Sequence, residues 1–253
     1  MTAKKTLALR PKPVAAVPDT AMVMAAGLGK RMRPLTATRP KPLVEVAGKP
    51  LIDHVLDRLR ASGVKRAIVN VHYLADVLEA HLRNRVTGIE IVVSDERGGL
   101  METGGGLVQA RDLIGDKPFV VANSDNLWID GPTDAIRLLA AQWDDARMDA
   151  LLLMVPLARA HNHGGLGDFR LAPDGRIVGW RTPGKPAPFV YTGVQILSPR
   201  VIRDWPAGPF STRLFWERAI ETGRAYGMVH QGLWFDVGTP AAIGKTEAIL
   251  ADG

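Results

Sequence analysis

Short apolar runs alternate with stretches of helical periodicity over the first part of the chain. Apolar runs typical of buried strands lie at residues 21–26, 67–72, 89–95, 118–125 and 150–157. Apolar positions at helical spacing lie between them, at residues 50–63, 73–85, 105–113 and 132–143. Because strands that alternate with helices need crossover connections, this region predicts a parallel sheet with helices on both faces.

The pattern changes after residue 157. Residues 167–180 contain two strand-like runs around a Pro-Asp-Gly turn, which predicts a β-hairpin. Further strands are expected at 188–199, 226–230 and 233–238, and further helices at 211–223 and 240–250. We therefore expect an α/β, Rossmann-like fold with a mostly parallel, mixed sheet flanked by helices. No internal repeat is found, so residues 21–253 are expected to form a single domain with two parts, 21–157 and 158–253.

Composition excludes several classes of protein. The chain has 253 residues and no cysteine, which excludes disulfides, thiolate metal sites and a cysteine nucleophile. No apolar run reaches the roughly 18 residues of a membrane span, and residues 1–20 predict a disordered basic tail. The formal charge of +6 suggests nucleic acid, but no basic stripe interleaved with aromatic residues accompanies it. We therefore expect neither a membrane nor a nucleic-acid partner.

The segment AAGLGKRMRPLTATRPKP, residues 25–42, has the composition of a phosphate-binding loop. A dinucleotide fingerprint fails because Met32 stands where the third glycine is needed. A P-loop fails because Lys30 is followed by Arg31 and not by serine or threonine. A third kind of phosphate loop therefore remains, directly after the first predicted strand.

The residues of this loop suit a nucleoside phosphate. Gly27 and Gly29 let the backbone pass close to a ligand and aim N–H groups at its phosphates. Arg31 and Lys41 add positive charge, arginine as a fork and lysine as a point charge.

The stretch AGLGKRMRPLTATRPKPLVEVAGKPLIDHVL closely resembles the signature of the nucleoside-triphosphate:sugar-1-phosphate nucleotidyltransferases. The resemblance recurs at residues 102–106, 123–126, 191–199 and 234–239, in the family's order, and covers essentially everything after residue 20. It implies a GT-A-like domain without a β-helix, with a nucleotide-binding half at 21–157 and a sugar-phosphate-binding half at 158–253. It also implies a cytoplasmic enzyme, which we expect to be a monomer or small homo-oligomer.

In that family, a sugar-1-phosphate oxygen attacks the α-phosphorus of a nucleoside triphosphate, giving a nucleotide-sugar and pyrophosphate. Two anions must meet in this reaction, so cations must offset their repulsion. A lone aspartate at a strand end is usually a cap or turn former, but the resemblance implies that Asp125 and Asp236 bind Mg²⁺. It gives Arg31 and Lys41 the catalytic role of neutralising the triphosphate, and no general base is needed because the attacking oxygen is already ionised.

The resemblance also implies the substrate contacts. Residues 104–106 are expected to open a helix capped by Thr103 and to let the backbone read the base edge. The nucleotide-binding residues are expected to be Ala26, Gly27, Gly29, Lys41, Gly104, Gly105 and Asn123. The sugar-phosphate-binding residues are expected to be Gly165, Asp168, Lys185 and Thr192.

One departure from the family pattern bears on the acceptor. Related enzymes carry Glu-Lys-Pro where this chain has Gly184, Lys185 and Pro186, so a negative charge is lost from the acceptor pocket. We hypothesise that the acceptor carries a carboxylate. N-acetylmuramate-1-phosphate does, and blocks such as ETGGG and WFDVGT are most similar to the uridylyltransferases that use it with UTP in cell-wall recycling, although those enzymes do not typically keep the Lys-Pro pair.

Other activities remain open from the sequence alone. The enzymatic alternatives are mannose-1-phosphate guanylyltransferase and glucose-1-phosphate nucleotidyltransferase. A catalytically inactive nucleotide-sugar sensor is the non-enzymatic alternative. Such a sensor should have lost the loop arginine, the lysine or a metal aspartate, and this chain keeps all of them.

Overall fold

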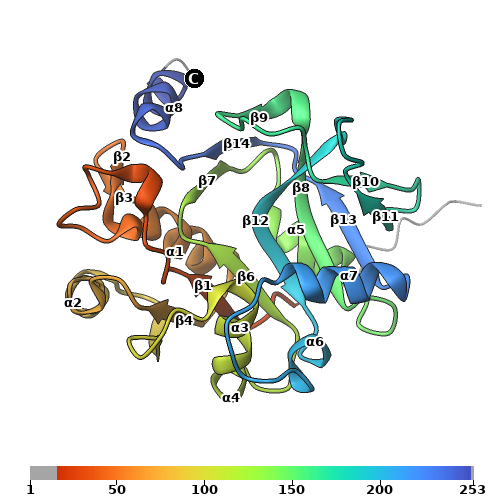
Figure 1. The fold of residues 1–253 in the computed structure, drawn as a ribbon, viewed down its shortest axis with the longest axis horizontal. Coiled ribbons are helices and arrows are strands. Elements are labelled where there is room, and N and C mark those ends of the chain that lie inside the picture. The colour runs from red at the N-terminus through yellow and green to blue at the C-terminus, as the bar shows by residue number, and fades with distance from the viewer. Residues whose placement is uncertain (1–15, 252–253) are drawn as a thin grey trace, which may run out of the picture.

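The computed structural model describes residues 16–251, so the predicted tail at 1–20 lies mostly outside the described residues. Within them, nine strands form one mixed sheet with the path β11-β10-β12-β6-β1-β4-β5, and β8 and β13 extend it from β12 (Figure 1). In the same range, every helix is too short or too polar to span a bilayer. The strands of this sheet are β1 (Thr20–Met24), β4 (Arg66–Val71), β5 (Glu90–Asp95), β6 (Phe119–Asn123), β8 (Ala150–Pro156), β10 (Phe169–Leu171), β11 (Ile177–Trp180), β12 (Phe189–Leu197) and β13 (Ala225–Val229).

Strands β5, β4, β1 and β6 are parallel neighbours, as the alternation of strands and helices predicts. Successive side chains of β1 point to opposite faces, so Ala21 and Val23 join one core cluster while Met22 and Met24 pack into another. Helices cover both faces, and the α/β class is confirmed. The first cluster is covered by α1 (Leu51–Ser62), α2 (Ala75–Arg85) and α5 (Ala135–Gln142), and the second by α3 (Glu102–Gln109), α4 (Arg111–Ile114), α6 (Arg200–Arg203) and α7 (Arg213–Glu221).

Strand β12 joins the two parts of the chain into one sheet. It runs antiparallel to β6, with Val194 opposite Ala122, and antiparallel to β8 on its other edge. The predicted hairpin is present as β10 and β11, where Phe169 pairs with Trp180. The core is therefore continuous from the first half of the chain into the second.

A second, three-stranded sheet has the order β7-β14-β9 and lies near the C-terminal helix α8 (Figure 1). Phe235 and Leu127 of this sheet share a small core with Met32 and with partly buried residues of α8. The strands β7 and β9 were not expected from the sequence, because β9 has only two residues and β7 directly follows the turn at residues 124–125 that ends β6. These elements and the remaining short ones are β7 (Asn126–Ile129), β9 (Ala160–His161), β14 (Leu233–Asp236), α8 (Pro240–Ala251), β2 (Glu45–Val46), β3 (Lys49–Pro50), η1 (Lys30–Met32), η2 (Lys41–Leu43) and η3 (Leu157–Arg159).

Candidate active site

A cavity of about 430 Å³ opens at the carboxyl ends of β1 and β6. The chain leaves β1 toward β4 on one side and later returns to β6 on the other, so the loops after these two strands diverge. Such a switch point is where open α/β sheets bind ligands. Of the predicted site residues, the structure brings Ala26, Gly27, Lys41, Asn123 and Asp125 into the wall of this cavity.

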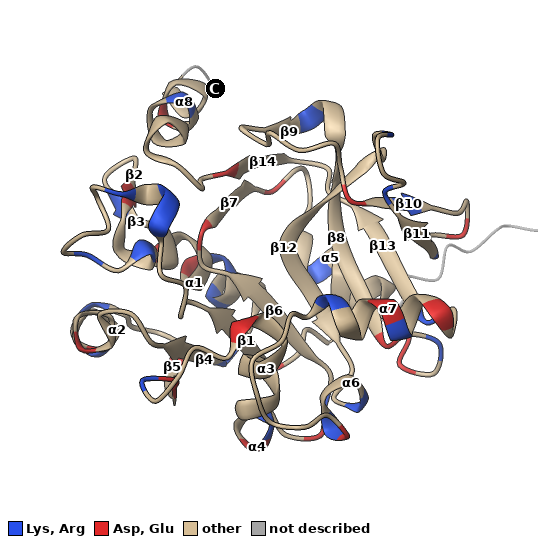
Figure 2. Ribbon diagram, in the orientation of Figure 1, with Lys and Arg blue, Asp and Glu red and all other residues tan. Residues whose placement is uncertain are grey.

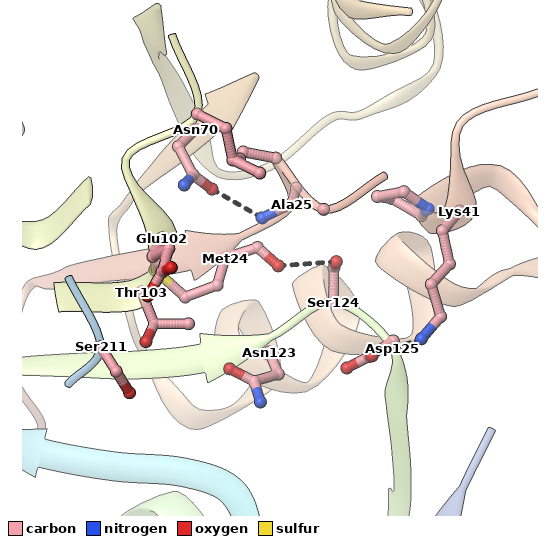
Figure 3. A pocket seen from close by; sticks show the side chains of 14 residues that line it. Met24, Ala25, Lys41, Asn70, Glu102, Thr103, Asn123, Ser124, Asp125 and Ser211 are labelled. Carbon is pink, nitrogen blue, oxygen red and sulfur yellow. Dashed lines mark hydrogen bonds and ion pairs between the residues drawn. The ribbon is translucent and has the colours of Figure 1, made fainter. Parts of the chain in front are cut away.

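Figure 3 shows two opposing walls of the cavity. Lys41 and Asp125 lie on one side, and Glu102, Thr103 and Ser211 lie on the other. Residues from both halves of the chain therefore line the same space. None of the last three was expected to line the cavity from its sequence pattern.

The two glycines of this loop, Gly27 and Gly29, have different functions. Gly27 is exposed on the cavity wall, and a Cβ there would meet nothing within 4 Å. Gly29 has φ +61°, and a Cβ there would lie 3.0 Å from side-chain carbons of Lys41 and Thr36. The Thr36 hydroxyl donates to the Gly29 carbonyl over 2.8 Å and closes the loop. Gly29 therefore shapes the loop while Gly27 is the glycine that reaches the cavity.

Lys41 and Asp125 form a short ion pair in the cavity. Lys41 Nζ donates to Asp125 Oδ2 over 2.5 Å, and the two side chains are 11% and 29% exposed. Lys41 comes from the first turn of η2, and Asp125 follows β6 directly, so two segments distant in sequence meet here. The pair holds the ammonium group at the carboxyl end of the sheet, where an anionic ligand would meet it.

The structure also places the backbone of Asp236 next to the segment that follows this pair. Strand β14 pairs with β7 so that Asp236 lies opposite Asn126, the residue after Asp125. A Cβ on Gly238 would lie 2.9 Å from Asp236 Oδ1 and 3.1 Å from Arg31 Nη2, so Arg31 also reaches this region. In Figure 2, basic ribbon beside β2 and β3 lies near acidic ribbon at the ends of β7 and β14.

The donor set of the two aspartates fits a hard divalent cation. Carboxylate oxygens are the ligands of Mg²⁺, which in phosphate-transfer sites takes one or two carboxylates plus substrate phosphates. One oxygen of Asp125 stays outside the contact with Lys41, and within residues 16–251 Asp236 makes no ion pair. In that range, no group of three or more His, Cys, Asp or Glu residues could hold a metal. A cation at this position would therefore share its coordination with a phosphate ligand.

The first residue after β1 is held by a buried amide. Asn70 of β4 is 2% exposed, and its Oδ1 accepts the Ala25 N–H over 2.6 Å (Figure 3). The Ser124 hydroxyl donates to the Met24 carbonyl over 2.8 Å and closes the end of β6 onto β1. Asn70 was not among the expected site residues, although a polar residue inside an apolar strand was a usable signal.

The start of the helix at the ETGGG segment, residues 102–106, differs from the expectation. Helix α3 begins at Glu102, so the glycines lie inside it, and Thr103 is not its cap but bonds Thr212 through its hydroxyl. The N–H groups of Gly104 and Gly105 donate to the Phe210 carbonyl over 2.7 and 3.0 Å. Neither glycine lines the cavity. Their contact with a nucleobase remains a prediction, and the structure supplies another reason for them, which is close packing.

This packing makes Gly105→Ala destabilising. A Cβ on Gly105 would lie 2.1 Å from the Gly208 carbonyl oxygen, a backbone atom that cannot rotate away. We expect the free energy of unfolding to fall by about 2 kcal/mol, as in other overpacked cores. Gly244→Ala is the matched control, because a Cβ there meets nothing within 4 Å, and it should raise the free energy by about 0.5 kcal/mol. Denaturant titration of both variants measures this, and a Gly105→Ala variant as stable as wild type would contradict the packing argument.

The four predicted sugar-phosphate residues do not line the cavity. Asp168 Oδ2 accepts the Tyr191 N–H over 2.9 Å, and Lys185 lies in an exposed turn. A Cβ on Gly165 would lie 2.6 Å from His163 Nε2. Gly165, Asp168 and Lys185 therefore lie in the second half of the chain outside the cavity, and their sugar contacts remain predictions.

Thr192 requires a correction. Its side chain is fully buried, and its hydroxyl donates to the Leu153 carbonyl over 2.9 Å. Its own carbonyl accepts N–H groups from Asn126 and Trp234, each over 2.8 Å. The hydroxyl therefore links β12 to β8 and does not contact a ligand. Through its carbonyl, Thr192 supports Asn126, the residue after Asp125.

Comparison with known proteins agrees with this geometry. Residues 20–177 match the family model described as Nucleotidyl transferase. The chain is 49% identical to the N-acetylmuramate alpha-1-phosphate uridylyltransferase of Caulobacter vibrioides, over 93% of this chain and 98% of that protein. It is 36% identical to the enzyme of the same name from Neisseria meningitidis serogroup B, over 90% and 97% of the two chains.

A solved structure supports the fold. HddC from Yersinia pseudotuberculosis superposes with a TM-score of 0.74 at 23% identity, covering 91% of this chain and 99% of that one.

Proposed function

This chain belongs to the nucleotidyl transferase family, and we propose that it is a sugar-1-phosphate nucleotidyltransferase that uses UTP and N-acetylmuramate α-1-phosphate. The observation that carries the reaction class is the Lys41–Asp125 pair at the sheet's switch point, with Asp236 opposite the next residue. The observation that carries the substrate is the near full-length similarity to two uridylyltransferases of that name. A cytoplasmic role in cell-wall recycling belongs to the same proposal.

In the proposed reaction, one bond to phosphorus forms and one breaks. An oxygen of the sugar phosphate attacks the α-phosphorus of UTP, the bond to the bridging oxygen breaks, and pyrophosphate leaves with the bond's electron pair. No proton needs to move, because the nucleophile and the leaving group are both anions. Catalysis then consists of positioning and of electrostatic stabilisation.

The residues of the cavity have distinct functions in this proposal. Ala26, Gly27 and Asn123 line the cavity. We assign the backbone at Ala26 and Gly27 to the nucleotide, and Asn123 to the nucleoside or the acceptor. Lys41 and Arg31 stabilise charge on the triphosphate and on the departing pyrophosphate. Asp125 and Asp236 would hold Mg²⁺, which when bound offsets the charge of both phosphates and aligns them.

The acceptor is proposed to bind in the second half of the chain. We assign nucleotide binding to residues 21–157 and sugar-phosphate binding to 158–253, which meet where β12 pairs with β6. The turn at Lys185 keeps a positive charge without a neighbouring glutamate, since Gly184 precedes the lysine. A basic, acid-free turn favours an acceptor whose sugar carries a carboxylate.

A pyrophosphate-release panel tests this proposal. N-acetylmuramate-1-phosphate, mannose-1-phosphate and glucose-1-phosphate are each combined with UTP and with GTP, and Asp125→Asn serves as the blank. We expect kcat/KM to be highest for UTP with N-acetylmuramate-1-phosphate, by about 100-fold over the neutral sugars, because a charge-recognising pocket discriminates strongly. Faster turnover of mannose-1-phosphate with GTP would replace the proposal by the guanylyltransferase alternative.

A further inference from the structure

A buried carboxylate lies directly behind the cavity. Glu96 follows β5 and is only 1% exposed. Its Oε1 accepts an N–H from Asn70 Nδ2 over 2.7 Å, and its Oε2 accepts the Met101 backbone N–H over 3.2 Å. Each oxygen therefore has one donor, and the two donors come from different elements.

One donor lines the nucleotide cavity, and the other adjoins its opposite wall. Asn70 links Glu96 to the glycine loop, because its Oδ1 accepts the Ala25 N–H at the start of that loop. Met101 immediately precedes α3, whose Glu102 and Thr103 line the opposite side (Figure 3). One chain of hydrogen bonds thus runs from the glycine loop through Asn70 and Glu96 to the start of α3.

Glutamate has the chemistry that this position requires. An ionised carboxylate is an acceptor at both oxygens, so it satisfies two facing donors and also orients the Asn70 amide with its oxygen toward Ala25. Space is made by Gly106, where a Cβ would lie 2.7 Å from Glu96 Oε1. Burial raises the pKa of the Glu96 carboxyl, while the N–H groups of Asn70 and Met101 act against this rise and stabilise the ionised form.

We propose that Glu96 is a positioning residue that sets the spacing between the glycine loop and the start of α3, and thereby the affinity for the nucleotide. It touches no substrate itself, since it lies behind Asn70 and Met101. This inference rests on the proposed function, which makes the cavity the nucleotide site. Its test uses nucleotide binding without an acceptor, so an error in the acceptor leaves the test valid.

The variant Glu96→Gln tests whether the two acceptor oxygens of Glu96 are needed, or only a buried side chain of this shape. Glutamine has nearly the same shape but presents one acceptor and one donor, so one of the two N–H groups would face another N–H group. We expect the Kd for UTP, measured by isothermal titration, to rise about 10-fold. Glu90→Gln is the matched control, because Glu90 is exposed at the other end of β5, and it should bind UTP as wild type does.

The double variant Asn70→Asp with Glu96→Gln exchanges the amide and the carboxylate and supplies the decisive test. The amide introduced at position 96 donates to the carboxylate introduced at position 70, and its oxygen accepts the Met101 N–H. The new carboxylate at position 70 also accepts the Ala25 N–H. The net charge and these hydrogen bonds are kept, but a carboxylate now lies in the cavity wall, so the double variant should bind UTP at least about threefold more tightly than Glu96→Gln, and should fold and bind UTP even if Glu96→Gln alone does not fold. Unchanged UTP affinity in Glu96→Gln, or a double variant that binds UTP no more tightly than Glu96→Gln, would overturn the proposal.

Discussion

Asp125→Asn is expected to lower kcat by about 1,000-fold, because a carboxylate that stabilises charge in the transition state becomes neutral. Asparagine keeps the shape of the side chain, so the β6 end and the Ser124 contact with Met24 stay in place. Two properties change: the ion pair with Lys41 is lost, and a proposed cation loses one anionic ligand. Pyrophosphate release at saturating substrates measures the effect.

A second aspartate and a matched control make this result specific. Asp236→Asn should lose activity to a similar extent, because Asp236 lies opposite the residue that follows Asp125. Asp116→Asn removes an exposed carboxylate from the turn before β6, far along the strand from the cavity, and should keep full activity. If either site variant kept activity within 10-fold of wild type, that aspartate would not be a ligand of the catalytic cation.

Lys41→Met has the second largest expected effect. Methionine keeps an unbranched side chain of similar length in a largely buried position but removes the only charge that contacts Asp125 within the described residues. We expect kcat/KM for UTP to fall by about 100-fold, the loss typical of removing one preorganised electrostatic donor.

A nearby lysine provides the control for this substitution. Lys49 also pairs with an aspartate, Asp57, but both side chains are substantially exposed. Exposed pairs of this kind contribute only about 0–1 kcal/mol, so Lys49→Met should leave kcat/KM within twofold of wild type. If both methionine variants lost activity equally, the effect would reflect general loss of positive charge and not the position of Lys41.

The order of strands and helices was predictable because each has a clear apolar period. Residues 50–63 and 73–85 become α1 and α2, and the hairpin around residue 174 forms as expected. Ala26, Gly27 and Asn123, which were expected to contact the nucleotide, line one cavity because they lie at the carboxyl ends of β1 and β6, which are neighbours in a parallel sheet. Such positions follow from local sequence and from topology together.

What the sequence did not show depends on contacts between distant residues. Gly105 packs against Gly208, and Thr192 is buried by its bond to Leu153, although each lies in a block that resembles a substrate-binding motif. The placement of Asp236 opposite Asn126 depends on β7, which was not expected from the sequence. Local pattern carries no information on such pairings, because they are decided by tertiary packing.

Asp125 and Asp236 are proposed to bind one divalent cation together when a nucleotide is present. Mn²⁺ takes the same oxygen ligands as Mg²⁺ and is visible by electron paramagnetic resonance. Titration of Mn²⁺ into the protein with a non-hydrolysable UTP analogue should show one bound ion in the wild type, and at least about 10-fold weaker binding in Asp125→Asn and in Asp236→Asn. Equal Mn²⁺ affinity in wild type and in either variant would show that the substituted aspartate does not bind the cation.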